Sequence, residues 1–220
     1  MSPLATTLAP MEAYRLLAGD YDRMPNPMLT LEQRTMTLLL PSLRGACVVD
    51  AAAGTGRWAS YCASQGARAI AVDFCNEMLA DAPRPVAVAD INCLPLPDSI
   101  ADVTICAFAM GYAPACLPEL ARITRSGGTI LVSDIHPDAI RRGWTRTFSH
   151  PMGTIEVAHH PYTLADLVAP NLRLDSLHEP CFGEPERDVF ANAGKLAAFD
   201  EAARHPALFV ARWIKGSTKA

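Results

Sequence analysis

The sequence of 220 residues lacks several features that mark particular classes of protein. No apolar stretch reaches the ~18 uninterrupted residues of a membrane-spanning helix. The first residues, MSPLATTLAPMEAYR, hold neither a basic residue before Arg15 nor the apolar core of a secretory leader. Lys and Arg form no dense run and the formal net charge is −4, so the attraction that dominates nucleic-acid binding has no obvious source. These absences predict a cytoplasmic protein with no membrane and no nucleic acid as partner.

Cysteine pairs in the C-x-x-C spacing are also absent, although the chain has seven cysteines. Their odd number and spacing give no motif for zinc or dithiol chemistry. We expect most of these side chains to be buried and reduced. Cys93 and Cys181 lie in segments that could border a ligand. Internal repeats and low-complexity tracts are absent as well.

The composition that is present is that of an ordered globular chain, with half of the residues hydrophobic and 19% charged. The length suits a single domain. From about residue 45, short β-rich runs alternate with helical patterns, which predicts a parallel sheet built from right-handed βαβ units. The predicted strands lie near 46–51, 68–73, 85–90, 101–107 and 128–134, and the predicted helices near 57–65, 76–81 and 115–125.

The two flanks of this region follow other patterns. The first 44 residues combine an apolar and aromatic stretch around Tyr14–Tyr21, a turn at Met24–Pro27 and a helix through about Leu40, which together could cover the mouth of the sheet. A segment rich in Pro, His, Arg and Trp follows residue 135 and runs to about residue 162. Beyond it we expect a short helix at TLADLV and strands at 172–178 and 207–214, the last of them antiparallel.

The segment VVDAAAGTGRWA at 48–59 carries the most chemical information. It reads as an apolar strand ending near Asp50, then a turn with Gly54 and Gly56, then a helix. Glycines let backbone approach a ligand without a Cβ clash, and a helix N-terminus presents free N–H groups. A glycine turn alone can be merely structural.

Two further acids strengthen the functional interpretation. Asp73 ends the run AIAVD and Asp90 ends VAVAD, so three successive predicted strands each bring an acid to their carboxyl ends. Ligands bind at that edge of such sheets, and an acid there can accept the ribose hydroxyls of a nucleoside. A single acid at a strand end is usually a cap or turn former, but three in succession favour a nucleoside site.

These residues resemble the class I methyltransferases that bind S-adenosylmethionine. DAAAGTGRW resembles their first motif, DFCNEML their second, ADINCLPLPDSIADVTICAFAM their third and fourth, and ELARITRSGGTILVSD the segment leading into their fifth strand. The resemblance is dense over about 45–134 and loose elsewhere. One departure is Ala52, which stands where a glycine is common and crowds the turn.

The resemblance implies S-adenosylmethionine as cofactor and assigns residues to its parts. The methionine end would be shaped by Asp50, Ala51, Gly54 and Gly56, with backbone around Ala107 meeting the amine; Asp73 would hold the ribose, Phe74 and Met78 would flank the adenosine, and Asp90 and Ile91 would contact the adenine. A tyrosine-bearing lid is implied by the opening segment, with Tyr21 the better candidate and Tyr14 the weaker one. Both tyrosines have an ordinary packing role as the alternative.

The acceptor side is expected in the loops after the fourth and fifth predicted strands. Met110, Tyr112, Arg141 and Trp144 are the substrate-binding candidates there. Methyl transfer is an in-line displacement that needs proximity and, for an alcohol or amine, a place for the departing proton. Histidine suits that proton because of its pKa, so we choose His136 as base, with His159 and His160 next. The alternative for His136 is a turn in which its ring bonds backbone; no metal-ligand spacing is present.

The predicted fold is α/β, a Rossmann-like doubly wound sheet of seven mostly parallel strands with an antiparallel last strand. The single domain 1–220 would comprise a helical lid (1–44), a cofactor-binding core (45–134), a substrate cover (135–162) and C-terminal helices and strands (163–220). The predicted function is methyl transfer to O or N of a small-molecule metabolite or natural product. Alternatives are a nicotinamide-dependent oxidoreductase, although the turn lacks G-x-G-x-x-G, and a non-catalytic binding module; a homodimer is left open.

Overall fold

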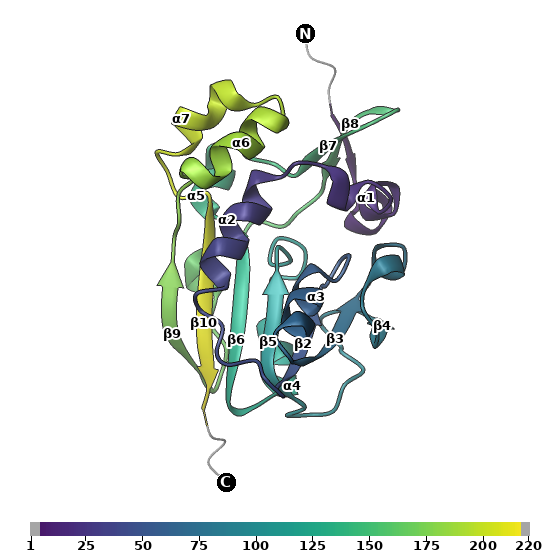
Figure 1. Cartoon of the computed structure of the whole chain (residues 1–220), viewed down its shortest axis with the longest axis vertical. Helices are drawn as coiled ribbons and strands as arrows, with labels where there is room; N and C mark the ends of the chain where they lie inside the picture. Colours follow the sequence, from purple (N-terminus) through teal and green to yellow (C-terminus); the bar gives the residue numbers. More distant parts are fainter. Residues whose placement is uncertain (1–4, 217–220) are drawn as a thin grey trace.

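A seven-stranded sheet forms the centre of the computed structural model, which describes residues 5–216 (Figure 1). Its strand order is β4-β3-β2-β5-β6-β10-β9. Strands β2 to β6 are mutually parallel, and β10 runs antiparallel to both of its neighbours. The predicted mostly parallel sheet with an antiparallel last strand is confirmed. The strands are β2 (Cys47–Ala51), β3 (Arg68–Asp73), β4 (Val86–Val88), β5 (Ala101–Ala107), β6 (Thr124–Ile135), β9 (Leu172–His178) and β10 (Leu208–Lys215).

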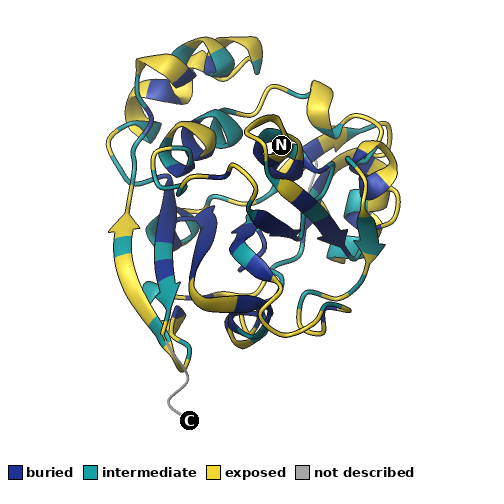
Figure 2. Cartoon of the chain, turned by 60° about the horizontal axis from the view of Figure 1, so that its bottom comes forward, coloured by how far each residue is buried: buried dark blue, intermediate teal, exposed yellow. Residues whose placement is uncertain are grey.

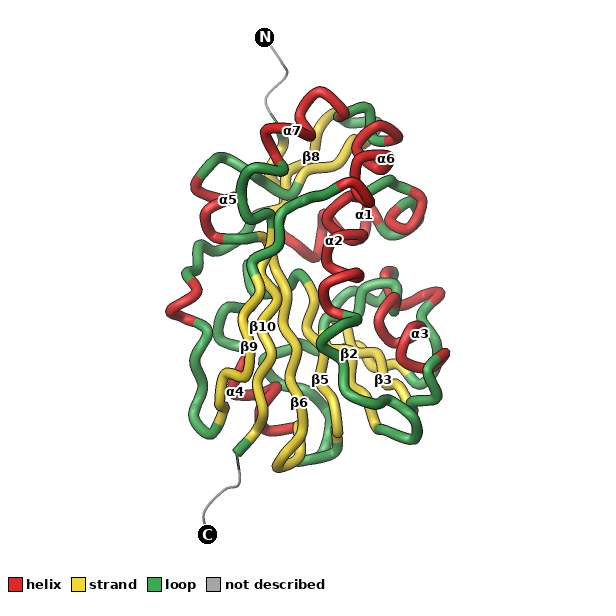
Figure 3. Tube along the Cα trace, turned by 60° about the vertical axis from the view of Figure 1, so that its left-hand side comes forward, coloured by secondary structure: helices red, strands yellow, loops and turns green. Residues whose placement is uncertain are grey.

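Alternate residues of the central strands enter two different cores, because successive side chains of a strand point to opposite faces. Val48 packs with residues of the helices on one face, whereas Val49 packs with the helix on the other. Figure 3 shows α2 and α3 on one side of the strands and α4 on the other. Both faces of the sheet are therefore covered, as in doubly wound folds.

The helices differ from the sequence prediction mainly at their ends. The helix predicted through Leu40 ends at Met36, and the segments predicted as helices at 76–81 and at TLADLV form short 3₁₀ turns. The helices are α1 (Pro10–Leu17), α2 (Pro27–Met36), α3 (Arg57–Ser64), α4 (Leu117–Ile123), α5 (Pro137–Arg141), α6 (Glu184–Asn192) and α7 (Phe199–Ala202), and the 3₁₀ turns are η1 (Tyr21–Arg23), η2 (Met78–Asp81), η3 (Leu164–Asp166) and η4 (Leu196–Ala198).

A second, small sheet joins the N-terminal segment to the segment after β6. It consists of β1 (Thr6–Leu8), β8 (Gly153–Val157) and β7 (Thr147–His150), in the order β1-β8-β7. β1 pairs in parallel with β8, and helix α1 packs against the same small core. Figure 1 shows this unit beside the carboxyl ends of the main sheet. The lid and the cover, which the sequence analysis treated as separate segments, are thus one structural unit.

Burial is concentrated in the main sheet, while α6, α7 and the edge strand β9 carry most of their residues at the surface (Figure 2). All seven cysteines are free thiols; Cys93 is exposed and Cys181 half-buried, while the other five are buried, as expected. Within residues 5–216, none of the helices is both long and apolar enough to cross a bilayer.

Candidate active site

A cleft lies where β2, β3 and β5 end, under the lid helix α1. Parallel strands bring their carboxyl ends to one edge of a sheet, where ligands bind in doubly wound folds. The lining combines the glycine turn, two acids and three tyrosines from distant parts of the chain. The lining residues are Tyr14, Tyr21, Asp50, Ala52, Ala53, Gly54, Thr55, Arg57, Trp58, Asp73, Phe74, Met78, Ala107, Phe108, Ala109 and Tyr112.

The turn after β2 needs left-handed backbone at three positions. Ala52, Gly54 and Gly56 have φ of 61°, 56° and 79°. A Cβ at Gly56 would lie 2.7 Å from Cδ of Pro83, so only glycine fits there. Ala52 keeps the same path at the cost of local strain, of order 1 kcal/mol for a non-glycine residue. The alanine noted in the sequence therefore adopts the left-handed backbone that favours glycine.

The two acids Asp50 and Asp73 are buried and held by backbone. Asp50 accepts the Ala59 N–H at 2.8 Å, and Asp73 accepts the N–H groups of Gly54 and Cys75 at 2.8 Å each. Burial raises the pKa of Asp50 to about 7, against the Ala59 N–H, which lowers it. Burial also raises the pKa of Asp73. Both carboxyls are thus fixed in position at the edge of the cleft.

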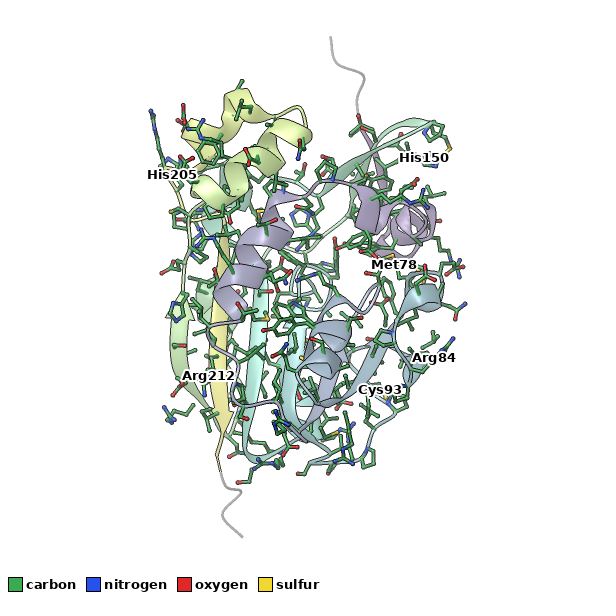
Figure 4. The ribbon with its side chains drawn as sticks, in the orientation of Figure 1. Met78, Arg84, Cys93, His150, His205 and Arg212 are labelled. Atoms are coloured by element: carbon green, nitrogen blue, oxygen red, sulfur yellow. The ribbon has the colours of Figure 1, made fainter. Side chains whose placement is uncertain are left out.

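The residues predicted around the adenosine are only partly brought together. Phe74 and Met78 line the cleft, and Figure 4 shows Met78 close to α1. Asp90 and Ile91 lie outside the lining. Strand β4 stops at Val88, and the exposed Asp90 carboxylate instead accepts the N–H of Asn92 at 2.8 Å in a local turn. Their predicted contact with adenine stays a prediction.

Three tyrosines form the roof of the cleft. The hydroxyls of Tyr14 and Tyr112 lie 2.9 Å apart, and the rings of Tyr14 and Tyr21 have centroids 6.3 Å apart. Burial raises the pKa of Tyr112 to about 12 and that of Tyr14 well above its usual value. All these phenols are neutral near pH 7 and can donate hydrogen bonds. Both lid candidates therefore lie at the cleft, Tyr14 as well as Tyr21.

A buried ion pair stands behind this roof. Arg146 forms an ion pair with Asp134, and its guanidinium carbon lies 4.7 Å from the centroid of the Tyr112 ring. Asp134 also accepts the Gly111 N–H at 2.9 Å. The Nη1 atom of Arg146 is buried and has no hydrogen-bond partner. The sequence placed Arg146 in the acceptor loops but did not single it out, because nothing in the local pattern shows which arginine turns inward.

The histidine candidates for a base lie outside the cleft lining. His136 is 4% exposed and caps helix α5: its Nδ1 accepts the Asp138 N–H at 3.1 Å, and its Nε2 lies 2.8 Å from Glu179. This is the turn role that the sequence analysis left as the alternative. His159 packs beside Gly111, and the exposed His160 donates its backbone N–H to the Gly111 carbonyl. Among the described residues, no hydrogen bond joins any of the three histidine side chains to a tyrosine of the roof.

The predicted substrate-binding residues divide in the same way. Tyr112 lines the cleft, whereas Met110 is fully buried in the main core. Arg141 is exposed and pairs with Asp138 one turn earlier on α5, and Trp144 stacks on Phe182 at 5.9 Å. Core packing, a surface ion pair and an aromatic stack engage Met110, Arg141 and Trp144 outside the cleft lining, so their contact with the acceptor stays a prediction.

The other residues predicted at the methionine end of the cofactor lie in or beneath the cleft. Gly54 and Ala107 line the cleft, while Ala51 and Gly56 are buried in the strand and turn beneath it. Within the described part of the chain, no three His, Cys, Asp or Glu side chains gather in a way that could hold a metal ion. The sequence analysis missed Glu32, a fully buried acid on α2 that accepts hydrogen bonds from Arg57, Trp58 and Ser133.

Comparison with known proteins agrees with this geometry. A family described as "Methyltransferase domain" matches residues 49–132. A malonyl-[acyl-carrier protein] O-methyltransferase of Pectobacterium atrosepticum is 32% identical over 169 residues, which are 69% of this chain and 66% of that protein. The protein of the same name from Yersinia pestis is 37% identical over 132 residues, 56% of this chain and 49% of that protein. This chain belongs to the class I S-adenosylmethionine-dependent methyltransferases.

Solved structures show the same fold. A methyltransferase from Mesorhizobium loti superposes with a TM-score of 0.65 at 18% identity, covering 84% of this chain and 98% of that one. The DhpI–SAH complex gives 0.64 at 19% identity, covering 94% of this chain and 96% of DhpI. The methyltransferase chain spans between about half and two thirds of the length of the curated relatives it matches.

The residues at the cleft fit the cofactor of this family. Gly54 has no Cβ atom to block the cleft, and the nearest atom to an added Cβ there would be Met78 Cε at 3.3 Å. Asp73 is fixed at the strand end where a ribose is held in this kind of fold. Phe74 and Met78 provide apolar walls beside it. Because the chain belongs to the methyltransferases, the alternative of a nicotinamide-dependent oxidoreductase is not supported.

Proposed function

We propose that this chain transfers the methyl group of S-adenosylmethionine to a carboxylate oxygen of a small acyl acceptor. A malonyl thioester is the first candidate, because several curated relatives are named malonyl-[acyl-carrier protein] O-methyltransferases. The acceptor would enter beside the tyrosine roof, at the opposite end of the cleft from Phe74 and Met78. The broader prediction of methyl transfer to O or N is thereby narrowed to a carboxylate oxygen.

The cofactor end follows from the geometry of the cleft. Asp73 would accept the ribose hydroxyls, Phe74 and Met78 would flank the adenosine, and Gly54 and Gly56 would let backbone approach the methionine part. Bound S-adenosylmethionine would supply a methyl group on an electrophilic sulfonium. The chain's part is to align the acceptor oxygen with that methyl group and to exclude water, which needs positioned groups more than acid–base chemistry.

The observation that carries the proposal is a buried, unpartnered nitrogen of Arg146. Arg146 lies outside the cleft lining but packs on the ring of the lining residue Tyr112, and the described lining holds no histidine. An alcohol or amine acceptor must lose a proton, which calls for a base. A carboxylate is already anionic and loses none: its oxygen bonds to the methyl carbon as the bond to sulfur breaks. Arg146 would then bind one carboxylate oxygen through Nη1, as guanidinium groups commonly do.

The tyrosine hydroxyls support the same acceptor. Tyr14 and Tyr112 keep their protons near pH 7 because burial raises the pKa of each. Neutral phenols donate hydrogen bonds to an anionic oxygen without adding charge to the site. Burial alone would lower the pKa of Arg146, but the Coulomb interactions with Asp134 and the neighbouring tyrosines outweigh it and raise the pKa. The guanidinium therefore stays charged when the acceptor binds.

The direct test is to incubate the purified chain with S-adenosylmethionine and a matched pair of thioesters, malonyl and acetyl, and to detect methyl ester by mass spectrometry. We expect a methyl ester from the malonyl thioester alone, since only it carries a free carboxylate. Two outcomes would overturn the carboxylate acceptor. One is equal formation of S-adenosylhomocysteine with both thioesters, and the other is methylation of an amine while neither thioester is methylated.

Two substitutions separate the arginine from the histidine. Arg146→Gln should lower kcat/KM for the malonyl thioester by about 100-fold or more, because it removes a charge-assisted hydrogen bond. His136→Asn should keep the rate within a few-fold, since asparagine is itself a favoured helix cap and no proton needs to be removed. A drop of about 10²–10⁴-fold in His136→Asn with unchanged cofactor affinity would instead make His136 a general base.

A further inference from the structure

One residue gives the cleft its only positive charge among the described lining residues. This residue is Arg57, the first residue of α3, directly after the glycine turn. Its Nη2 donates to Glu32 at 2.6 Å, and its side chain is 25% exposed. Its Nη1 atom is buried and has no hydrogen-bond partner. The cleft therefore contains a charged donor with free N–H groups that the chain itself does not satisfy.

Glu32 fixes the orientation of this guanidinium. It is 0% exposed, and its Oε1 accepts Trp58 Nε1–H at 2.9 Å and Ser133 Oγ–H at 2.8 Å, which leaves Oε2 for Arg57. Three elements, α2, α3 and β6, thus converge on one carboxylate. A buried charge is costly unless it is paired, so Glu32 and Arg57 hold each other in place. If the Arg57 side chain turned away from the cleft, the buried Glu32 carboxylate would lose its ion pair.

A buried donor without a hydrogen-bond partner destabilises the fold, and more so when it is charged. The neighbouring acid does not relieve it, because Asp50 bonds the Ala59 N–H and no bond joins it to Arg57. An anion from outside the chain would give this nitrogen the hydrogen-bond partner that it lacks. The cofactor carries such an anion: its methionyl part is a zwitterion with one carboxylate, and the glycine turn that shapes the methionine end lies immediately before Arg57.

We propose that Arg57, oriented by Glu32, binds the carboxylate of the methionyl part of the cofactor. This rests on the proposed function only through its cofactor and not through its acceptor. Asp73, Phe74 and Met78 mark the nucleoside end of the cleft and Arg57 the amino-acid end, so the two together set the direction in which the cofactor lies. Glu32 acts as a positioning residue, since it touches Arg57 and not the ligand.

The test compares two ligands that differ only in this carboxylate: S-adenosylhomocysteine and its decarboxylated form, S-adenosyl-3-thiopropylamine. Isothermal titration with the wild-type chain should give an affinity about 10- to 100-fold higher for S-adenosylhomocysteine, the range expected for a charge-assisted hydrogen bond. In Arg57→Gln this ratio should fall to within about 3-fold. The affinity for the decarboxylated ligand should change little.

Two further variants make the comparison specific. Arg15→Gln removes the same charge from an exposed arginine outside the cleft lining, which pairs with Glu77 at 3.3 Å, and should keep the wild-type ratio. Glu32→Gln keeps an oxygen for Trp58 and Ser133 but presents N–H groups to Arg57, so it should lower the ratio without removing the arginine. Thermal unfolding of each variant shows that it is folded.

The outcomes divide cleanly. A ratio that stays at the wild-type value in folded Arg57→Gln overturns the role of Arg57, while leaving the proposed function standing. A ratio that falls equally in Arg15→Gln assigns the effect to net charge and also overturns it. Failure of the wild-type chain to bind S-adenosylhomocysteine at all would overturn the proposed function itself, and with it this role.

Discussion

At the scale of single residues, Asp50 has the clearest pH-dependent behaviour. Burial raises its pKa from the ordinary value of 3.8 to about 7, so the folded chain holds a proton that the unfolded chain releases. The folded state binds more protons between about pH 4 and pH 7, and the contribution of this group to stability falls as pH rises through that window. Above pH 7 the cost is constant.

We predict that Asp50→Asn flattens this pH dependence. Asparagine keeps an oxygen for the Ala59 N–H and cannot ionise, so the variant should gain stability relative to wild type as pH rises from 4 to 7. The difference at pH 7 should be a few kcal/mol at most, since each pKa unit corresponds to about 1.4 kcal/mol. Urea unfolding of both proteins at several pH values measures it. Parallel curves would show that Asp50 ionises normally in the folded chain.

Asp73 and Asp90 form a natural pair for testing the nucleoside end. Asp73→Ala should weaken the binding of S-adenosylhomocysteine by roughly 2–3 kcal/mol, because it removes a charged acceptor from the ribose hydroxyls. Asp90→Ala should cost less, since this acid is exposed and engaged with Asn92. Calorimetry on both variants decides it. An unchanged dissociation constant for folded Asp73→Ala would remove this acid from the site.

The sequence allowed the acids to be found but not the arginines. Asp50 and Asp73 stand at strand ends in a recognisable pattern, and the structure holds both beside the cleft. Arg57 and Arg146 owe their roles to Glu32 and Asp134, which lie 25 and 12 residues away along the chain. Such pairings depend on how elements pack. His136 shows the converse, because its position after a strand fits both a base and a helix cap, and only the bonded N–H of Asp138 separates them.

At the scale of elements, prediction succeeded where periodicity is local. The strands predicted at 101–107 and 172–178 are confirmed to the residue, because apolar runs bounded by turn residues mark them. Strand β1 was not predicted, since its three residues, Thr6–Leu8, are ordered by pairing with β8 almost 150 positions later. The turn η2 was predicted as a helix but is only four residues long, with Pro83 two positions beyond Asp81.

The element η1 is tied to the glycine turn by one side-chain contact. Thr55 Oγ1 donates to Asp22 at 3.0 Å, which joins the lid to the loop beneath it. Asp22→Ala should speed dissociation of S-adenosylhomocysteine by about 2- to 10-fold, the effect of one modest hydrogen bond. Stopped-flow fluorescence measures the rate.

The matched control for this lid contact is Asp20→Ala. Asp20 lies just before η1, and its side chain forms a surface ion pair with Arg23 at 3.3 Å. Surface pairs of this kind contribute little, so Asp20→Ala should leave the dissociation rate unchanged. Equal rates in both variants and wild type would show that the lid is held by packing of its tyrosines rather than by this contact.

At the scale of the whole molecule, the main sheet and the small sheet have hydrophobic cores of very different size. The main sheet is enclosed by large clusters on both faces, whereas the small sheet and α1 share a cluster of five buried residues: Ala13, Leu17, Phe148, Ile155 and Val157. Buried apolar area is the dominant stabilising term, so the small unit has far less to hold it closed. It also supplies Tyr14 to the roof of the cleft. We therefore expect the unit that covers the cleft to open at a lower free-energy cost than the main sheet.

This difference predicts the order of hydrogen exchange. Regions with few buried contacts open at lower free energy than core strands, so the amides of β7 and β8 should exchange at least about 10-fold faster than those of β5 and β6. Adding S-adenosylhomocysteine should slow exchange in α1, η1 and the turn at 52–57, because the ligand bridges the lid to the main sheet, and should leave edge strand β9 unchanged. Exchange read by mass spectrometry of peptides tests both statements. If β7 and β8 exchange as slowly as β5 without ligand, the two sheets unfold as one unit; the ligand would then have to enter through motion of side chains alone.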